Sequence, residues 1–474
     1  MLATGLALAV PALHAWQLDP SLSLPGQRAT AMASTGVMQV PPAAQVAGRA
    51  WARWLEAVTD NPVLAEAQAQ ADAAEARHQR SARQATWPRL DLQATEQRDR
   101  QVGEGRTVVA PAGSYSLTVS MPLWRPADQR EVQGLQAAGQ ASRQKAHGTR
   151  LDVALDVSQA YLSGLHAQAR ATVRARQMDE LHALEGVQER LLAAGLLTVV
   201  DVQATRSQSL QVRDQWLQDQ GDAAQQLWSL RRLVGPTATL PRGLHALPSG
   251  RAPIPWQDLA PGEITAQVRE HPLALAADAH IRAAQARTEA RQAGRWLPVV
   301  DASASRGHRR LTQRFEGLAD RQSLRNDTVG VNLQWPLFGA DSLGDGERIA
   351  AAELAEAQAR RDAVLADLTR DMQGALEAHD LAEQQQTTRA DWLAHAELAR
   401  DAVHRAWLAG LRPTADRLRA QQAVLDAALA LVDARIARMR SGARVLALLG
   451  RLDAPHIAPW LAEIDHPASD LPPP

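Results

Sequence analysis

The sequence predicts an α+β fold in which long antiparallel helices alternate with pairs of β-strands, arranged as two copies of one unit. Four landmark residues recur in the same order in each half of the chain. They are Pro62, Pro88, Gly195 and Gly235 in the first half, and Pro272, Pro298, Gly410 and Gly450 in the second. Their spacings differ by only a few residues between the halves, which indicates a duplicated architecture.

These landmarks and the composition divide the chain into six segments. They are a predicted signal peptide at 1–15, an extended segment at 16–50, a first structural repeat at 51–235, a Pro-rich linker at 236–262, a second repeat at 263–450 and a flexible tail at 451–474. The first segment is apolar and ends in Leu13-His14-Ala15, as a secretory signal does, although it lacks a positive start. The chain has no apolar run of about 18 residues, so we expect no transmembrane helix.

Composition excludes several classes of function. The chain of 474 residues carries 51 Lys and Arg against 52 Asp and Glu, so we expect no nucleic-acid partner. The absence of cysteine excludes disulfides, thiolate metal sites and a cysteine nucleophile. The 14 histidines show no paired metal-ligand spacing. Because no nucleophile, base or cofactor pattern is present, we expect no metal, no cofactor and no enzymatic activity.

The helices of each copy follow from proline, glycine and apolar spacing. In the first copy Pro62 opens a helix and Pro88 ends it. A long helix then runs from about residue 122 to about residue 194 with the apolar spacing of a coiled coil. Gly195 breaks it, and the pair Thr198 and Asp201 resembles a capping box that opens a return helix. About 70 helical residues make a rod of roughly 105 Å, which two shorter helices stacked end to end would nearly match.

The strands alternate apolar and polar residues, as in a sheet that is wet on one side. The alternation is visible in residues 90–95, 115–123 and 329–335. A lipid-facing barrel wall with a polar interior has this pattern, and open sheet edges are not tolerated in lipid. Four strands cannot close a barrel, so two chains would supply eight strands or three would supply twelve, and the pattern does not choose between them.

The two strand-to-strand connections differ in composition. Gly103-Glu104-Gly105 is expected to be a hairpin tip, not a phosphate-binding loop. The second connection, expected at about 306–327, is rich in arginine. We expect a solvated loop there, and contact with lipid phosphates is the alternative.

Four tryptophans lie where helices and strands meet. Trp87 and Trp296 precede the first strand of each copy, and Trp124 and Trp335 follow the second. They are placed to form a membrane-interface belt, because aromatic residues collect at such interfaces. The alternative is that each ring wedges the corner between helix and strand, and both can hold.

The doubled order of these elements resembles the TolC-type outer membrane efflux family over roughly residues 51–452. The resemblance depends on the opening Asn61-Pro62, the Pro-ended strands at Pro122-Leu123-Trp124 and Pro336-Leu337-Phe338, and the turn from Gly195 to Asp201-Val202-Gln203-Ala204. It implies a homotrimer that shares one 12-stranded barrel in outer membrane lipid, with a helical tunnel in the periplasm. It also implies an exit duct for efflux or type I secretion, docked to a periplasmic adaptor and an inner membrane pump. The alternative is a soluble periplasmic coiled-coil adaptor or structural protein.

The resemblance also implies a constriction at the helix-turn tips marked by Gly195 and Gly410. By position, its residues are Asp201, Trp407, Arg412 and Asp416. We expect Asp201 and Arg412 to pair across adjacent coils and three copies of Asp416 to line the aperture, where carboxylate rings favour cations. The alternative is that Asp201 and Asp416 only satisfy helix N-termini.

The chain departs from the family pattern near this constriction. Trp407 stands where an aromatic hydroxyl is common, and an indole cannot accept a hydrogen bond. Arg419, beside Arg417, stands where a second aspartate can follow Asp416. A strongly acidic double ring is therefore not expected.

Overall fold

The computed structural model describes residues 51–103, 106–240, 256, 261–315, 318–335, 337 and 344–457. The chain divides into units Met1–Pro41 and Pro42–Pro474, and all described residues belong to the second. The predicted signal peptide, the extended segment at 16–50 and most of the linker at 236–262 lie outside the described residues. None of the helices in the described ranges has the length and apolar character that crossing a bilayer requires.

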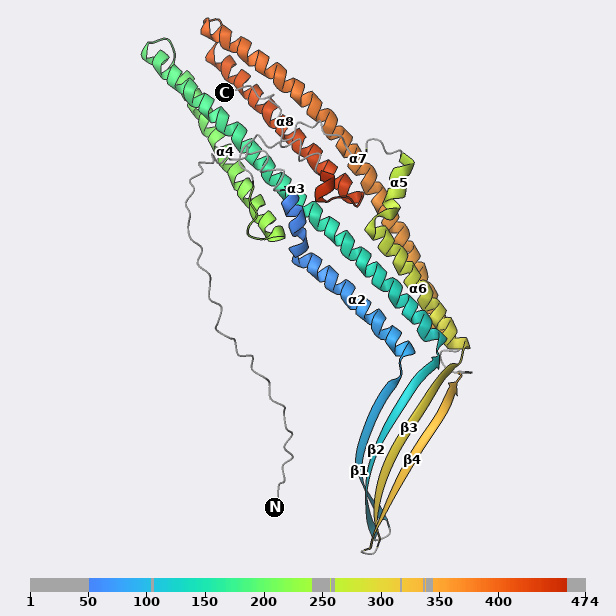
Figure 1. Ribbon diagram of the computed structural model, residues 1–474. Helices are drawn as coiled ribbons and strands as arrows, with labels where there is room; N and C mark the ends of the chain where they lie inside the picture. The colour runs from blue at the N-terminus through green and yellow to red at the C-terminus, as the bar shows by residue number, and fades with distance from the viewer. Residues whose placement is uncertain are drawn as a thin grey trace, which may run out of the picture. The chain divides into compact units, whose positions relative to one another are not determined.

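The helices predicted for each copy are present, and α5 is an additional short helix that the sequence did not predict. The helices are α2 Pro62–Thr86, α3 Pro126–Ala193, α4 Val199–Val234, α5 Pro261–Glu270, α6 Pro272–Trp296, α7 Asp345–Leu408 and α8 Thr414–Leu448. The 25-residue α2 and the 36-residue α4 both pack on the 68-residue α3 (Figure 1). In the second copy α6 and α8 pack on α7 in the same way. The expected pairing of two short helices with one long helix is confirmed.

Helix α3 also joins the two copies, because it packs on α6 and α8. Small residues permit this close approach: a Cβ added at Gly134 of α3 would lie 3.4 Å from the carbonyl oxygen of Ala283 in α6. Ala283 and its neighbour Ala286 are buried there. The abundance of alanine and the scarcity of Phe and Tyr follow from this packing, since interhelical distance depends on the side chains at the contact.

The chain before α2 is helical, which the sequence analysis did not anticipate. Residues 51–56 form a helical turn that continues into η1, Ala57–Asp60. Trp51 is fully buried, stacks on Tyr161 of α3 with ring centroids 6.0 Å apart, and donates a hydrogen bond from Nε1 to Ser158 Oγ at 3.1 Å. This entry segment is therefore part of the main core.

Residues 451–457, the described part of the segment assigned to a flexible tail, also contribute to the core, and residues 458–474 lie outside the described residues. Leu452 and Ile457 are buried in the same cluster as Trp51. Between them Asp453 accepts a hydrogen bond from the backbone N–H of His456 at 3.1 Å, which starts a short helical turn at 454–457. The packing of these two apolar side chains orders the chain beyond α8.

The four strands form one antiparallel sheet in the order β1-β2-β3-β4. They are β1 Arg89–Gly103, β2 Arg106–Trp124, β3 Val299–Phe315 and β4 Leu318–Gln334. The sheet continues from the ends of α2, α3 and α6 (Figure 1). Within the described part of the chain, the outer edges of β1 and β4 have no partner strand.

The expected loop at 306–327 is wrong, because β3 and β4 extend almost to each other. Only residues 316–317 separate the end of β3 from the start of β4. Arg306 and Asp327 are register partners, and two hydrogen bonds of 2.8 and 2.9 Å join the guanidinium to the carboxylate. Opposite charges facing each other across strands stabilise an extended pair, so the arginine-rich sequence continues the ladder.

The two helix-turn tips use the same backbone device. Gly195 and Gly410 have φ of +72° and +73°. After Gly410 the N–H of Leu411 bonds to the carbonyl of Ala406 at 2.9 Å, while the N–H of Gly410 bonds to that of Trp407 at 2.9 Å. This is a Schellman motif, which requires a left-handed residue after the helix and so favours glycine.

Gly410→Ala is expected to lower the free energy of unfolding by about 1 kcal/mol, because an L side chain is strained in the left-handed region. The matched control is Gly374→Ala in α7, where an added Cβ meets nothing within 4 Å. That change is expected to raise stability by about 0.5–1 kcal/mol, since alanine is the better helix former. Urea unfolding followed by circular dichroism measures both, and equal effects would contradict the assignment of strain.

Candidate pore and gating sites

One face of the sheet is apolar and exposed. Leu90, Val119, Ala304 and Val329 form a single row across all four strands. Leu90 is 65% exposed and Val329 is 86% exposed. The adjacent row points to the opposite face and consists of polar side chains: Asp91, Thr118, Ser305 and Thr328. The predicted division into an apolar and a polar face therefore holds in three dimensions.

The apolar face is bounded at both ends by residues suited to an interface. At the helix end, Trp87, Trp124, Trp296 and Trp335 are 67, 41, 63 and 55% exposed. At the far end lies the Arg306–Asp327 pair. Trp335 and Asp327 are separated by roughly 27 Å along β4. At a tilt of about 40° this becomes roughly 21 Å, close to the apolar band of a barrel wall.

At the α7–α8 tip, Asp416 binds two arginines. Arg412 approaches one carboxylate oxygen at 3.1 Å and Arg419 approaches the other at 2.9 Å. The carboxylate side chain is 21% exposed, whereas the two arginine side chains are 61 and 78% exposed. Asp416 is thus covered by guanidinium groups rather than presented as a free carboxylate.

Trp407 supports the same tip through its ring and its N–H. Its Nε1 donates to Thr414 Oγ1 at 3.4 Å, and the guanidinium of Arg417 lies 4.3 Å from the ring centroid. His404 also stacks on the Trp407 ring, with ring centroids 6.1 Å apart. Burial, together with the charges of Arg417 and Arg400, outweighs Asp401 and lowers the pKa of His404.

At the α3–α4 tip, the corresponding aspartate has a different role. The Asp201 carboxylate accepts from the Thr198 backbone N–H at 3.3 Å, and Thr198 Oγ1 accepts from the Asp201 N–H at 3.4 Å. The predicted capping box is confirmed. Among the described residues of one chain, no ion pair joins Asp201 to Arg412, so their pairing stays a prediction for adjacent coils in an assembly.

Comparison with known proteins decides the class of this chain. The model of the family described as "Outer membrane efflux protein" matches residues 55–236 and 266–451. The chain belongs to this family. The outer membrane efflux family assignment confirms the resemblance seen in the sequence, the predicted fold class and the outer membrane location.

Individual relatives agree with the family assignment. Outer membrane protein OprJ of Pseudomonas aeruginosa is 28% identical over 290 residues, which cover 59% of this chain and 57% of OprJ. The match thus spans little more than half of that relative. A crystal structure of a membrane protein from P. aeruginosa superposes with a TM-score of 0.70 at 22% identity, covering 84% of this chain and 93% of the other. VceC of Vibrio cholerae superposes with a TM-score of 0.70 at 17% identity, covering 86 and 98%.

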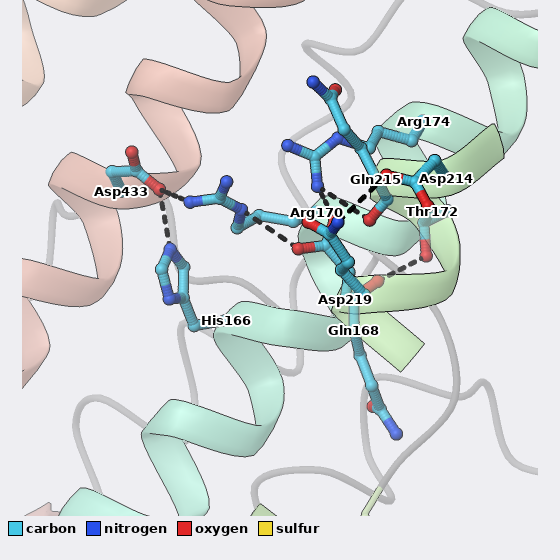
Figure 2. A network of polar contacts seen from close by, with 10 residues as sticks. His166, Gln168, Arg170, Thr172, Arg174, Asp214, Gln215, Asp219 and Asp433 are labelled. Atoms are coloured by element: carbon cyan, nitrogen blue, oxygen red, sulfur yellow. Dashed lines mark hydrogen bonds and ion pairs between the residues drawn. The ribbon is translucent and has the colours of Figure 1, made fainter. Parts of the chain in front are cut away.

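This efflux family member also contains a polar network, midway along its helices, that the sequence did not predict. It joins α4, α3 and α8, as Figure 2 shows. His166 of α3 approaches Asp433 of α8 at 2.6 Å, and Arg170 lies 3.6 Å from the same carboxylate oxygen. On its other side Arg170 lies 3.4 Å from Asp219 of α4, which Arg174 also binds.

The network could have been suspected from one signal, the row of His166, Arg170 and Arg174 at every fourth position of α3. This spacing places the three side chains on one helix face. The partners could not be identified, because Asp433 lies 267 residues from His166. The network therefore connects α3 to α4, its neighbour in the first copy, and to α8, which belongs to the second copy.

Arg174 and Asp219 form a buried pair, with side-chain exposures of 8 and 7%. Arg174→Ala is expected to cost about 2–3 kcal/mol of stability, because it leaves the buried Asp219 with only the 3.4 Å contact to Arg170. The control is Arg206→Ala, whose pair with Glu189 is about half exposed. That change should cost less than about 1 kcal/mol. Similar losses in urea unfolding of the detergent-solubilised protein would contradict the buried role.

Asp433 is expected to make stability depend on pH. Burial raises its pKa, but the hydrogen bond and charge of His166 with the charges of Arg170 and Arg389 outweigh burial and lower the pKa. A lowered folded-state pKa stabilises the fold above the unfolded value of about 4 and loses this effect as pH falls through the folded value. Asp433→Asn should flatten the fall in melting temperature between pH 5 and 2. The exposed Asp222→Asn should not, and equal slopes would contradict the assignment.

Proposed function

We propose that three copies of this chain form the outer membrane exit duct of a tripartite efflux or type I secretion system. The observation that supports this most directly is the sheet, which has an exposed apolar face and, among the described residues, two edges without a partner strand. Lipid does not tolerate open edges, so neighbouring chains must close them. Three chains would supply the twelve strands that the resemblance implies.

In this assembly the tryptophans form a belt at the periplasmic membrane interface. Their half-exposed rings at the helix–strand junctions support this role more than that of corner wedges. The helices continue as a tunnel through the periplasm. Solute passes passively, and the chain performs no chemistry because an inner membrane pump supplies the energy.

The helix-turn tips form the periplasmic end, where a periplasmic adaptor docks. Both tips expose large apolar side chains, among them Leu196, Val200, Leu408 and Leu411. Exposed apolar surface of this kind supports contact with another protein. A soluble periplasmic adaptor or structural protein, the alternative, agrees poorly with the family assignment.

The gate of the duct consists of Asp201, Trp407, Arg412 and Asp416. Arg412 carries five N–H donors and can hold Asp416 of its own chain while it reaches Asp201 of an adjacent coil. Asp416 lies at the aperture, and Trp407 fixes the turn through Thr414 and Arg417. Opening would require the contacts between coils to separate.

Asp201→Ala combined with Arg412→Ala is expected to raise single-channel conductance in planar bilayers, because the contact that holds adjacent coils together is lost. The control is Glu189→Ala with Arg206→Ala, which removes a pair between α3 and α4 of the same coil. Unchanged conductance in the first variant would contradict the pairing of Asp201 with Arg412.

The duct itself is tested by membrane fractionation. Recovery of the wild-type protein as a soluble monomer, without heat-modifiable trimers in the membrane fraction, would contradict it.

A further inference from the structure

The α7–α8 tip is strongly basic. Residues 400–419 contain five arginines and two aspartates, with neither lysine nor glutamate. The corresponding 20 residues of the other tip, 185–204, contain one arginine, two glutamates and one aspartate. The two tips of one chain therefore differ in the sign of their charge, although their backbones turn in the same way.

The arginines of the basic tip are only partly compensated. Asp401 pairs with Arg400 at 2.9 Å, and Asp416 is shared by Arg412 and Arg419. Arg405 donates to a backbone carbonyl rather than to a carboxylate. The guanidinium groups around Asp416 are more exposed than its carboxylate, so the surface of the cluster is positively charged. The N-terminus of α8 adds the positive end of a helix dipole at the same place.

We propose that the constriction formed by the Arg412–Asp416–Arg419 cluster selects anions and binds small oligophosphates, which block the duct from the periplasmic side. The proposal depends on the proposed function, because it requires three tips around one aperture. Each copy then presents Arg412, Arg417 and Arg419 against Asp416 and the Asp201 of an adjacent coil. This excess of positive charge replaces the cation preference expected of a bare Asp416 ring. Guanidinium groups bind phosphate oxygens in a bidentate manner, so phosphate chains suit this cluster better than halides.

The test uses the full chain reconstituted in planar bilayers. Under a tenfold KCl gradient the reversal potential should show chloride more permeant than potassium. Inorganic tripolyphosphate on the helical side should reduce the current, whereas spermine should not. In Arg412→Gln with Arg419→Gln, potassium should become the more permeant ion, and the half-blocking concentration of tripolyphosphate should rise about tenfold or more, the scale of local counter-ion enrichment in charged clefts.

The matched control is Arg360→Gln with Arg370→Gln. It removes two exposed arginines of α7 that also pair with carboxylates on their own helix. Its selectivity and block should equal those of the wild type. Wild-type channels that prefer potassium, or that spermine blocks and tripolyphosphate does not, overturn the anion proposal and leave the duct standing. Failure to form any channel overturns the proposed function and this inference with it.

Discussion

The close packing of α3 against α2, α4, α6 and α8 is the interaction on which the rest of the fold depends. Small residues at this interface let the helix backbones approach, as the contact of Gly134 with Ala283 shows. Each buried alanine contributes little apolar area, so stability must come from many contacts along the helices. Large buried side chains form one cluster that includes Trp51, which precedes α2, and Ile457, which follows α8.

Much of the fold could be predicted because its signals are local. Pro62, Gly195 and Gly410 mark helix ends through backbone rules that need no tertiary contact. The strand ends were harder to predict from sequence. The arginines of β3 are typical of a loop, and only the pairing of Arg306 with Asp327 on the neighbouring strand accounts for them. The helical turn at residue 51 was missed because it is stabilised by burial of Trp51 against α3, a tertiary contact that no local signal reports.

The two aspartates of the tips show why the candidate site was only half predictable. Both follow a turn glycine, and a carboxylate can cap a helix at either place. Thr198 offers Asp201 a hydroxyl and completes a capping box, whereas Pro413 has no side-chain acceptor and leaves Asp416 to the arginines. The difference could be inferred from one residue, but the number of arginines that reach Asp416 depends on side-chain geometry.

The pairing of β2 with β3 has a consequence for folding. Met121 and Ala302 are neighbours in the sheet, although α3, α4, α5 and α6 all lie between them in sequence. The β1–β2 and β3–β4 hairpins are local, because each pairs two strands that are consecutive in the sequence. Contacts of large sequence separation carry a loop-closure cost that must be met before they contribute, so they form slowly. The two hairpins should therefore join only after α3 and α6 have docked, which delays the appearance of an extended apolar sheet while the chain is still in water.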